Sequence, residues 1–188
     1  CLAHYPLDHI VLDPVMVSTS GCRLIEEEAI EAVKSLLLPR ATLVTPNIPE
    51  AEILSGLPVT NEREMERAAQ RLFQIGCRAV LIKGGHLEGA ESYDLLFTPQ
   101  ADPVRYTSPR IATRNTHGTG CTFSSAIASY LALGRDLPDA VAAAKTYLTR
   151  ALEAGADVTI GHGHGAVNHL FAPCVLTPRD DETTNKNG

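Results

Sequence analysis

The segment Asn115–Thr122 holds the residues best suited to chemistry. It reads N-T-H-G-T-G-C-T, so two glycines flank Thr119 just before a run of small residues that predicts a helix. Glycines let the backbone approach a ligand closely, and the unpaired N–H groups at a helix start favour an anion such as phosphate. Cys121 falls in the first turn, where thiols generally ionise more readily. From these residues alone, a tight turn and a small packing cysteine stay open as alternatives.

A second candidate segment reads T-P-N-I-P-E over residues 45–50. Asn47 and Glu50 lie three positions apart across a predicted helix start, so their side chains can point to one side. Amide and carboxylate oxygens suit Mg²⁺ held largely through water. The same pair is also the pattern of an ordinary helix cap with an acid in the first turn.

Two further motifs stand where predicted strands end. Lys83 closes an apolar strand and precedes two glycines, at the edge where α/β sheets bind ligands, so it either reaches a nucleotide phosphate or is a solvated lysine. Asp13 begins D-P-V-M, which is a ligand-facing segment or only a strand-terminating turn. Three histidines in and after the glycine-rich stretch 161–165 suggest Zn²⁺, but so many glycines make a poor frame for a metal.

The elements that must position these motifs alternate along the chain. Strands are expected at 9–13, 41–45 and 78–83, a hairpin or edge pair at 93–98 and 104–107, and helices at 26–38 (stopped by Pro39), 49–55, 62–75, 118–133 and 137–154. This order predicts a mostly parallel sheet covered on both faces. We expect one domain over 1–178 and a disordered polar tail over 179–188. Cys1 stands so close to the first strand that we expect a longer parent protein whose N-terminal strands are missing here.

Composition excludes several classes of protein. The 188 residues carry 44% hydrophobic and 20% charged residues with a net charge of −6, and no basic patch with interleaved aromatics that would bind nucleic acid. No apolar run approaches the ~18 to 20 residues of a membrane span. Five cysteines without a C-x-x-C pair fit free thiols in a reducing compartment, so the expected location is the cytoplasm.

Together, the four motifs resemble those of the hydroxymethylpyrimidine/phosphomethylpyrimidine kinases of the ribokinase superfamily, in the same order from about residue 9 to residue 171. The resemblance implies a ribokinase-like three-layer α/β/α sandwich. It also implies ATP-dependent phosphorylation of 4-amino-5-hydroxymethyl-2-methylpyrimidine, and then of its monophosphate, in thiamine biosynthesis. The partners it implies are small molecules, with a homodimer for the complete protein. Ala166 stands where the family usually has proline.

The resemblance also assigns roles to individual residues. It makes Gly118, Thr119 and Gly120 an anion hole and Cys121 the base on the substrate hydroxyl, where most of the superfamily has aspartate. The remaining roles are ATP binding by Lys83, substrate contact by Val15 and Cys121, and Mg²⁺ held through water by Glu50, Asn47 and Asp13. Two alternatives stay open: a pyridoxal kinase of the same fold, and an inactive fragment that only binds nucleotide.

Overall fold

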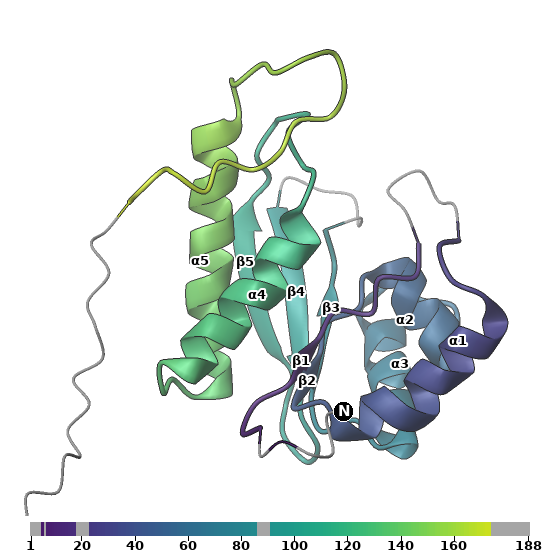
Figure 1. Cartoon of the computed structure of the whole chain (residues 1–188). Helices are drawn as coiled ribbons and strands as arrows, with labels where there is room; N and C mark the ends of the chain where they lie inside the picture. The colour runs from purple at the N-terminus through teal and green to yellow at the C-terminus, as the bar shows by residue number, and fades with distance from the viewer. Residues whose placement is uncertain (1–4, 6, 18–22, 86–90, 174–188) are drawn as a thin grey trace, which may run out of the picture.

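Five strands form one sheet in the order β1-β2-β3-β4-β5 in the computed structural model, which describes residues 5, 7–17, 23–85 and 91–173 (Figure 1). The strands are β1 (Val11–Leu12), β2 (Leu43–Val44), β3 (Val80–Lys83), β4 (Glu91–Phe97) and β5 (Val104–Pro109). β1, β2 and β3 pair in parallel, whereas β3–β4 and β4–β5 are antiparallel.

The sheet is therefore mixed, and the prediction of a mostly parallel sheet was wrong for this part of the fold. The expected hairpin is confirmed as β4 and β5, and β4 adds directly to β3. The connection over 84–90 is too short for the crossover of a dozen or more residues that a parallel pair requires. The predicted tail over 179–188 lies outside the described residues.

Helices cover both faces of the sheet, as Figure 1 shows. On one side lie α1 (Glu27–Ala32), α2 (Ile48–Ser55) and α3 (Glu62–Ile75), and on the other lie α4 (Thr119–Ala132) and α5 (Leu137–Gly155). Successive strand residues alternate between the two resulting cores. Val80 and Ile82 pack toward α2 and α3, whereas Leu81 between them packs toward α4 and α5. The three-layer arrangement expected from the sequence is present.

Most helix ends follow local signals that the sequence carries. Asn47, Asn61 and Asp136 cap α2, α3 and α5 with their side chains, and Gly56 and Gly76 end the first two in left-handed conformations. No helix within the described ranges is both long and apolar enough to cross a membrane.

The helix expected over 26–38 is the exception. The α-helical part ends at Ala32, and a π-helical turn over Val33–Leu37 and a 3₁₀ turn over Leu38–Arg40 continue the chain. Pro39 has no N–H to continue α-helical bonding, and the backbone changes its hydrogen-bonding period around it. Pro39 therefore does not stop the helical path, which runs two residues further than predicted, to Arg40.

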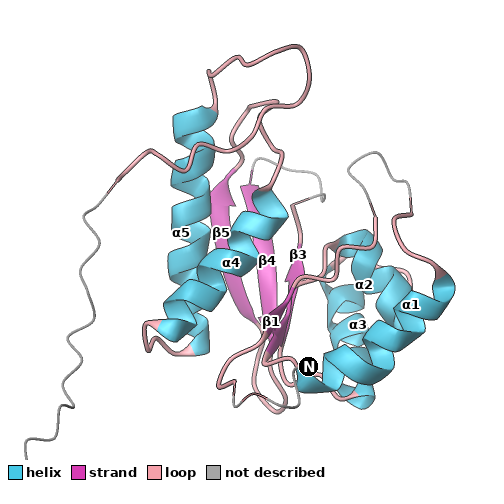
Figure 2. Ribbon diagram, in the orientation of Figure 1, coloured by secondary structure: helices cyan, strands magenta, loops and turns pink. Residues whose placement is uncertain are grey.

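Residues 156–173 follow α5 without a helix or strand of their own, and we call this segment the C-terminal strap (Figure 2). It returns to the loop that precedes α4, where His117 N donates to Gly165 O at 3.0 Å and Val167 N donates to His117 O at 3.4 Å. The strap thus borders the glycine-rich helix start singled out in the sequence.

Candidate active site

The carboxyl ends of the three parallel strands bring together an ion pair and a hydroxyl. Asp13 follows β1, Thr45 follows β2 and Lys83 ends β3. Lys83 Nζ donates to Asp13 Oδ1 at 2.7 Å, and Thr45 Oγ1 donates to the same oxygen at 3.1 Å. The Lys83 and Asp13 side chains are only 14% and 13% exposed, so the pair is fixed in a partly desolvated position. Both residues lie at strand ends, as the sequence predicted, and the structure shows that they contact each other.

The start of α4 lies directly over this ion pair. A β-carbon built on Gly120 would lie 3.4 Å from Lys83 Nζ and 3.7 Å from Asp13 Oδ2. Gly118 is the N-cap with φ +86°, a conformation that favours glycine, and no side chain caps this helix. Among described helices of eight residues or more, α2, α3 and α5 all have side-chain caps. No side chain therefore covers the start of α4 beside Lys83, where uncapped N–H groups favour an anion, although Thr119 N donates to Thr116 O at 3.3 Å.

Cys121 occupies the first turn of α4 and is exposed. The residues that follow it, Thr122 and Phe123, are buried, so the helix presents the thiol to solvent and packs its next positions into the core. Cys77 shows the opposite environment, since burial raises the pKa of its thiol to about 11. Of these two cysteines, only Cys121 is placed to meet a substrate.

Asn47 and Glu50 form a complete capping box at the start of α2. Glu50 N donates to Asn47 Oδ1 and Asn47 N donates to Glu50 Oε2, both at 2.9 Å. Glu50 Oε1 also accepts from Met16 N at 3.4 Å, which ties the D-P-V-M segment to α2. Burial, as the largest cause, raises the pKa of Glu50, while nearby Lys83 lowers it. The geometry is that of the helix-cap alternative, and the proposed role in Mg²⁺ binding stays a prediction.

Val15 stands at the rim of the same edge. It follows Asp13 and Pro14, its N–H donates to Asp13 O at 2.9 Å, and the residue is 47% exposed. An exposed branched side chain beside the ion pair is suited to contact an aromatic ring. Its contact with the pyrimidine remains a prediction.

Asn115 is a structural anchor that the sequence motif contained without a role assigned to it. It is buried, and its Nδ2 donates to Gly155 O and Val158 O, both at 2.6 Å. Gly165 packs so close to the Asn115 side chain that a β-carbon there would overlap Asn115 Oδ1. These contacts join the loop before α4 to the strap, and a cleft of about 750 Å³ between 112–115 and 156–163 adjoins them.

The histidines of the strap serve separate partners. His164 Nδ1 lies 3.2 Å from Arg114 O, while His169 lies 3.2 Å from Tyr147 Oη through Nδ1 and 3.5 Å from Thr122 Oγ1 through Nε2. The described residues contain no group of three or more His, Cys, Asp or Glu that could hold a metal ion.

Thr45 was missed as a site residue, although its position offered a signal. It follows β2 at the edge where Asp13 and Lys83 lie, and it is 1% exposed. A polar residue at the carboxyl end of a buried parallel strand is a candidate for the ligand crevice. Thr45 could have been named on that rule.

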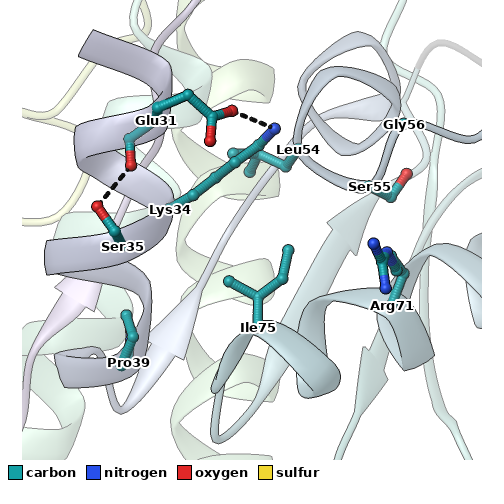
Figure 3. A pocket seen from close by; sticks show the side chains of 9 residues that line it. All are labelled: Glu31, Lys34, Ser35, Pro39, Leu54, Ser55, Gly56, Arg71 and Ile75. Atoms are coloured by element: carbon teal, nitrogen blue, oxygen red, sulfur yellow. Dashed lines mark hydrogen bonds and ion pairs between the residues drawn. The ribbon is translucent and has the colours of Figure 1, made fainter. Parts of the chain in front are cut away.

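A second hollow of about 510 Å³ lies between α1, α2 and α3 (Figure 3). Lys34 reaches Glu31 across one turn at 2.9 Å, and Ser35 Oγ donates to Glu31 O at 2.7 Å. The lining comes from the helices on one face of the sheet and includes none of the site residues described above.

The fold is that of ribokinase-like kinases. The pyridoxal kinase from Staphylococcus aureus, solved in complex with ADP, superposes with a TM-score of 0.82 at 35% identity, covering 89% of this chain and 60% of that chain. The sequence pattern described as phosphomethylpyrimidine kinase matches residues 1–168. The chain belongs to the phosphomethylpyrimidine kinase family.

Two curated relatives show the degree of similarity. The hydroxymethylpyrimidine/phosphomethylpyrimidine kinase of Escherichia coli is 43% identical over 172 residues, which cover 91% of this chain and 64% of the relative. The thiamine biosynthesis bifunctional protein ThiED of Geobacter sulfurreducens is 50% identical over 171 residues, which cover 91% of this chain and 34% of the relative. The chain thus spans less than two thirds of the length of either relative.

Proposed function

We propose that the protein containing this chain transfers the γ-phosphoryl group of ATP to 4-amino-5-hydroxymethyl-2-methylpyrimidine and then to the resulting monophosphate, in thiamine biosynthesis. The observation that carries this proposal is the Lys83–Asp13 ion pair beneath the uncapped, glycine-rich start of α4, with Cys121 exposed in its first turn. Phosphoryl transfer depends mainly on positioning and charge neutralisation, and this arrangement supplies both.

In the proposed first step, the hydroxymethyl oxygen attacks the γ-phosphorus, and the bond from that phosphorus to the β–γ bridging oxygen breaks. The N–H groups of Gly118, Thr119 and Gly120 and the Lys83 ammonium receive the charge on the transferred group. Cys121, in the first turn of α4, takes the hydroxyl proton as general base. ADP leaves. In the second step, a phosphate oxygen of the monophosphate is the nucleophile.

The residues present are compatible with Mg²⁺. Asp13 Oδ1 is occupied by Lys83 and Thr45, while Asp13 Oδ2 faces Gly120 and the proposed phosphate position. A Mg²⁺ ion that keeps most of its water would be held through water by Asp13, Glu50 and Asn47, and would neutralise phosphate charge. Because Mg²⁺ usually uses only one or two carboxylates plus phosphate oxygens, it needs no preformed cluster of acids.

Pyridoxal phosphorylation is the second candidate, because the solved pyridoxal kinase has the same fold over 89% of this chain. The pyrimidine is favoured because the E. coli pyrimidine kinase shares more sequence, 43% against 35%. We further propose a cytoplasmic enzyme that works as a homodimer in its complete form.

Competition kinetics on the natural polypeptide that contains this chain would test the proposal. With ATP and Mg²⁺, we expect a higher kcat/KM for the hydroxymethylpyrimidine than for pyridoxal. Lys83→Met should abolish most transfer, because the phosphate site loses its cation. Lys34→Met, which removes a lysine paired with Glu31 in the hollow between α1, α2 and α3, is the matched control and should leave the rate unchanged.

A clear preference for pyridoxal would move the assignment to the second candidate. Nucleotide binding without any transfer would indicate a protein that binds nucleotide but does not act as a kinase.

A further inference from the structure

A second ion pair lies buried on the same side of the sheet as Lys83. Lys145 of α5 donates from Nζ to Asp94 Oδ2 of β4 at 2.6 Å, and these side chains are only 10% and 5% exposed. Lys145 Nζ also lies 3.5 Å from Ser92 Oγ and 6.0 Å from the centre of the Phe123 ring. None of the roles proposed above uses this pair.

The other oxygen of Asp94 connects the pair to the proposed phosphate site. Gly84 N, directly after Lys83, donates to Asp94 Oδ1 at 3.0 Å and also to Tyr93 O at 3.0 Å. Asp94 and Lys83 are register partners across the antiparallel β3–β4 ladder. The carboxylate therefore shares the Gly84 N–H with Tyr93 O and helps to fix the peptide that follows Lys83, at the point where β3 ends.

A stability role alone explains this pair poorly. Taking two charges out of water is costly, and replacing a buried ion pair by well-packed apolar residues is often neutral or stabilising. A fixed acceptor for the Gly84 N–H, in contrast, restricts the direction in which the chain leaves β3 after Lys83. Lys83 Nζ must meet Asp13 on one side and the start of α4 on the other, so its backbone position sets the geometry of both contacts.

We propose that Asp94 is a positioning residue for phosphoryl transfer: paired with Lys145, it holds the Lys83–Gly84 turn so that Lys83 Nζ lies beneath the N-terminus of α4. This inference rests on the proposed kinase function.

The chemistry of the side chain suggests a specific test. Asp94 satisfies two donors with two oxygens, whereas asparagine has one acceptor oxygen and an NH₂ group. In Asp94→Asn, Lys145 takes that oxygen, and the NH₂ group then faces the Gly84 N–H, donor against donor. Adding Lys145→Met frees the oxygen for Gly84 and restores the anchor without either charge.

In the natural polypeptide, we expect Asp94→Asn to lower kcat about 10- to 100-fold with little change in the KM for the pyrimidine, because small misplacements of reacting groups cost up to about 10²-fold. The double variant Asp94→Asn/Lys145→Met should recover most of this loss. Val141→Ala, a buried α5 position that packs in the same core, controls for lost stability and should keep its kcat.

Amide hydrogen exchange at Gly84, followed by NMR, is a second readout that needs no turnover. It should be faster in Asp94→Asn than in the native protein, and slow again in the double variant. Native kcat in Asp94→Asn, or a double variant no better than the single one in both measurements, would overturn the proposal. If the native protein transfers no phosphoryl group, the proposed function fails, and the exchange data still decide whether Asp94 fixes the turn.

Discussion

Gly120→Ala would test whether the space between α4 and Lys83 is the phosphate position. The added β-carbon would lie 3.4 Å from Lys83 Nζ and 3.7 Å from Asp13 Oδ2, which the folded chain can accommodate with little movement. Gly120 lies within α4 and has no positive φ. Because alanine is the better helix former, we expect the free energy of unfolding to rise by about 0.5–1 kcal/mol.

Activity should change in the opposite direction. A phosphate oxygen that accepts from an ammonium lies about 2.8 Å from its nitrogen. A methyl group 3.4 Å from Lys83 Nζ occupies the same volume, so the phosphoryl group must shift. A displacement on the order of 1 Å lowers the rate by about 10²-fold. The substitution should therefore stabilise the protein and lower its kcat.

Urea denaturation and ATP-dependent transfer, measured on the same preparations, would check both halves of this prediction. Ser129→Ala is a matched control, because Ser129 is an exposed position in the C-terminal half of α4, where its hydroxyl donates to Ser125 O. It should raise stability by roughly 0.5 kcal/mol through helix propensity and leave the rate unchanged. Native kcat and KM in Gly120→Ala would refute the placement of the phosphate beside Gly120.

Three further predictions address other parts of the site. Cys121→Ala should lower kcat by about 10²–10⁴-fold and leave the affinity for ADP unchanged. Cys121→Ser should lower kcat as much as Cys121→Ala does, whereas Cys121→Asp should keep more activity than either. A near-native kcat in Cys121→Ala would show that the thiol is a packing residue. Burial raises the pKa of Glu50 above 4.5, so folded Glu50 keeps its proton to higher pH than the unfolded chain does. The contribution of protonated Glu50 to stability is full below about pH 4.5 and is lost as the pH rises through the raised pKa of the folded protein. In urea titrations, the native protein should therefore lose stability relative to Glu50→Gln over that pH window. A stability difference between the two proteins that does not change with pH would contradict this. Gly165→Ala should lower the free energy of unfolding by about 1–3 kcal/mol, because the added methyl group overlaps Asn115. In the same urea assay, the double variant Gly165→Ala/Asn115→Ala should lose less stability than the sum of the two single losses.

The sequence was most informative where function depends on local backbone. The start of α4 at Gly118 was predicted from two glycines before a small-residue run, and the structure begins the helix at Thr119. Asp13 and Lys83 were each predicted to stand at the end of a strand, and in the structure the two side chains meet at 2.7 Å. These predictions succeeded because helix starts and the carboxyl ends of parallel strands are fixed by short stretches of chain.

Contacts between residues far apart in the chain could not be predicted from the sequence. Asp94 reads as one polar residue in a strand and Lys145 as one lysine in an amphipathic helix, and 51 positions separate them. Nothing local indicates that the two side chains meet in the interior. The mixed sheet escaped prediction for the same reason: strand direction depends on which neighbour a strand joins, and a strand's own residues do not specify its neighbour.

The strap also determines when the site can form during synthesis. Hydrogen bonds from Asn115 to Val158 and between Arg114 and His164 join residues 43 and 50 positions apart, so the loop before α4 is held by chain made much later. Chains emerge from the ribosome at about 5–20 residues per second, and N-terminal parts fold first. The sheet and α4 can pack several seconds before the strap arrives. A nascent chain therefore acquires its hydrophobic cores before the loop that precedes α4 is fully anchored, and the proposed phosphate site is complete only after the strap has been translated.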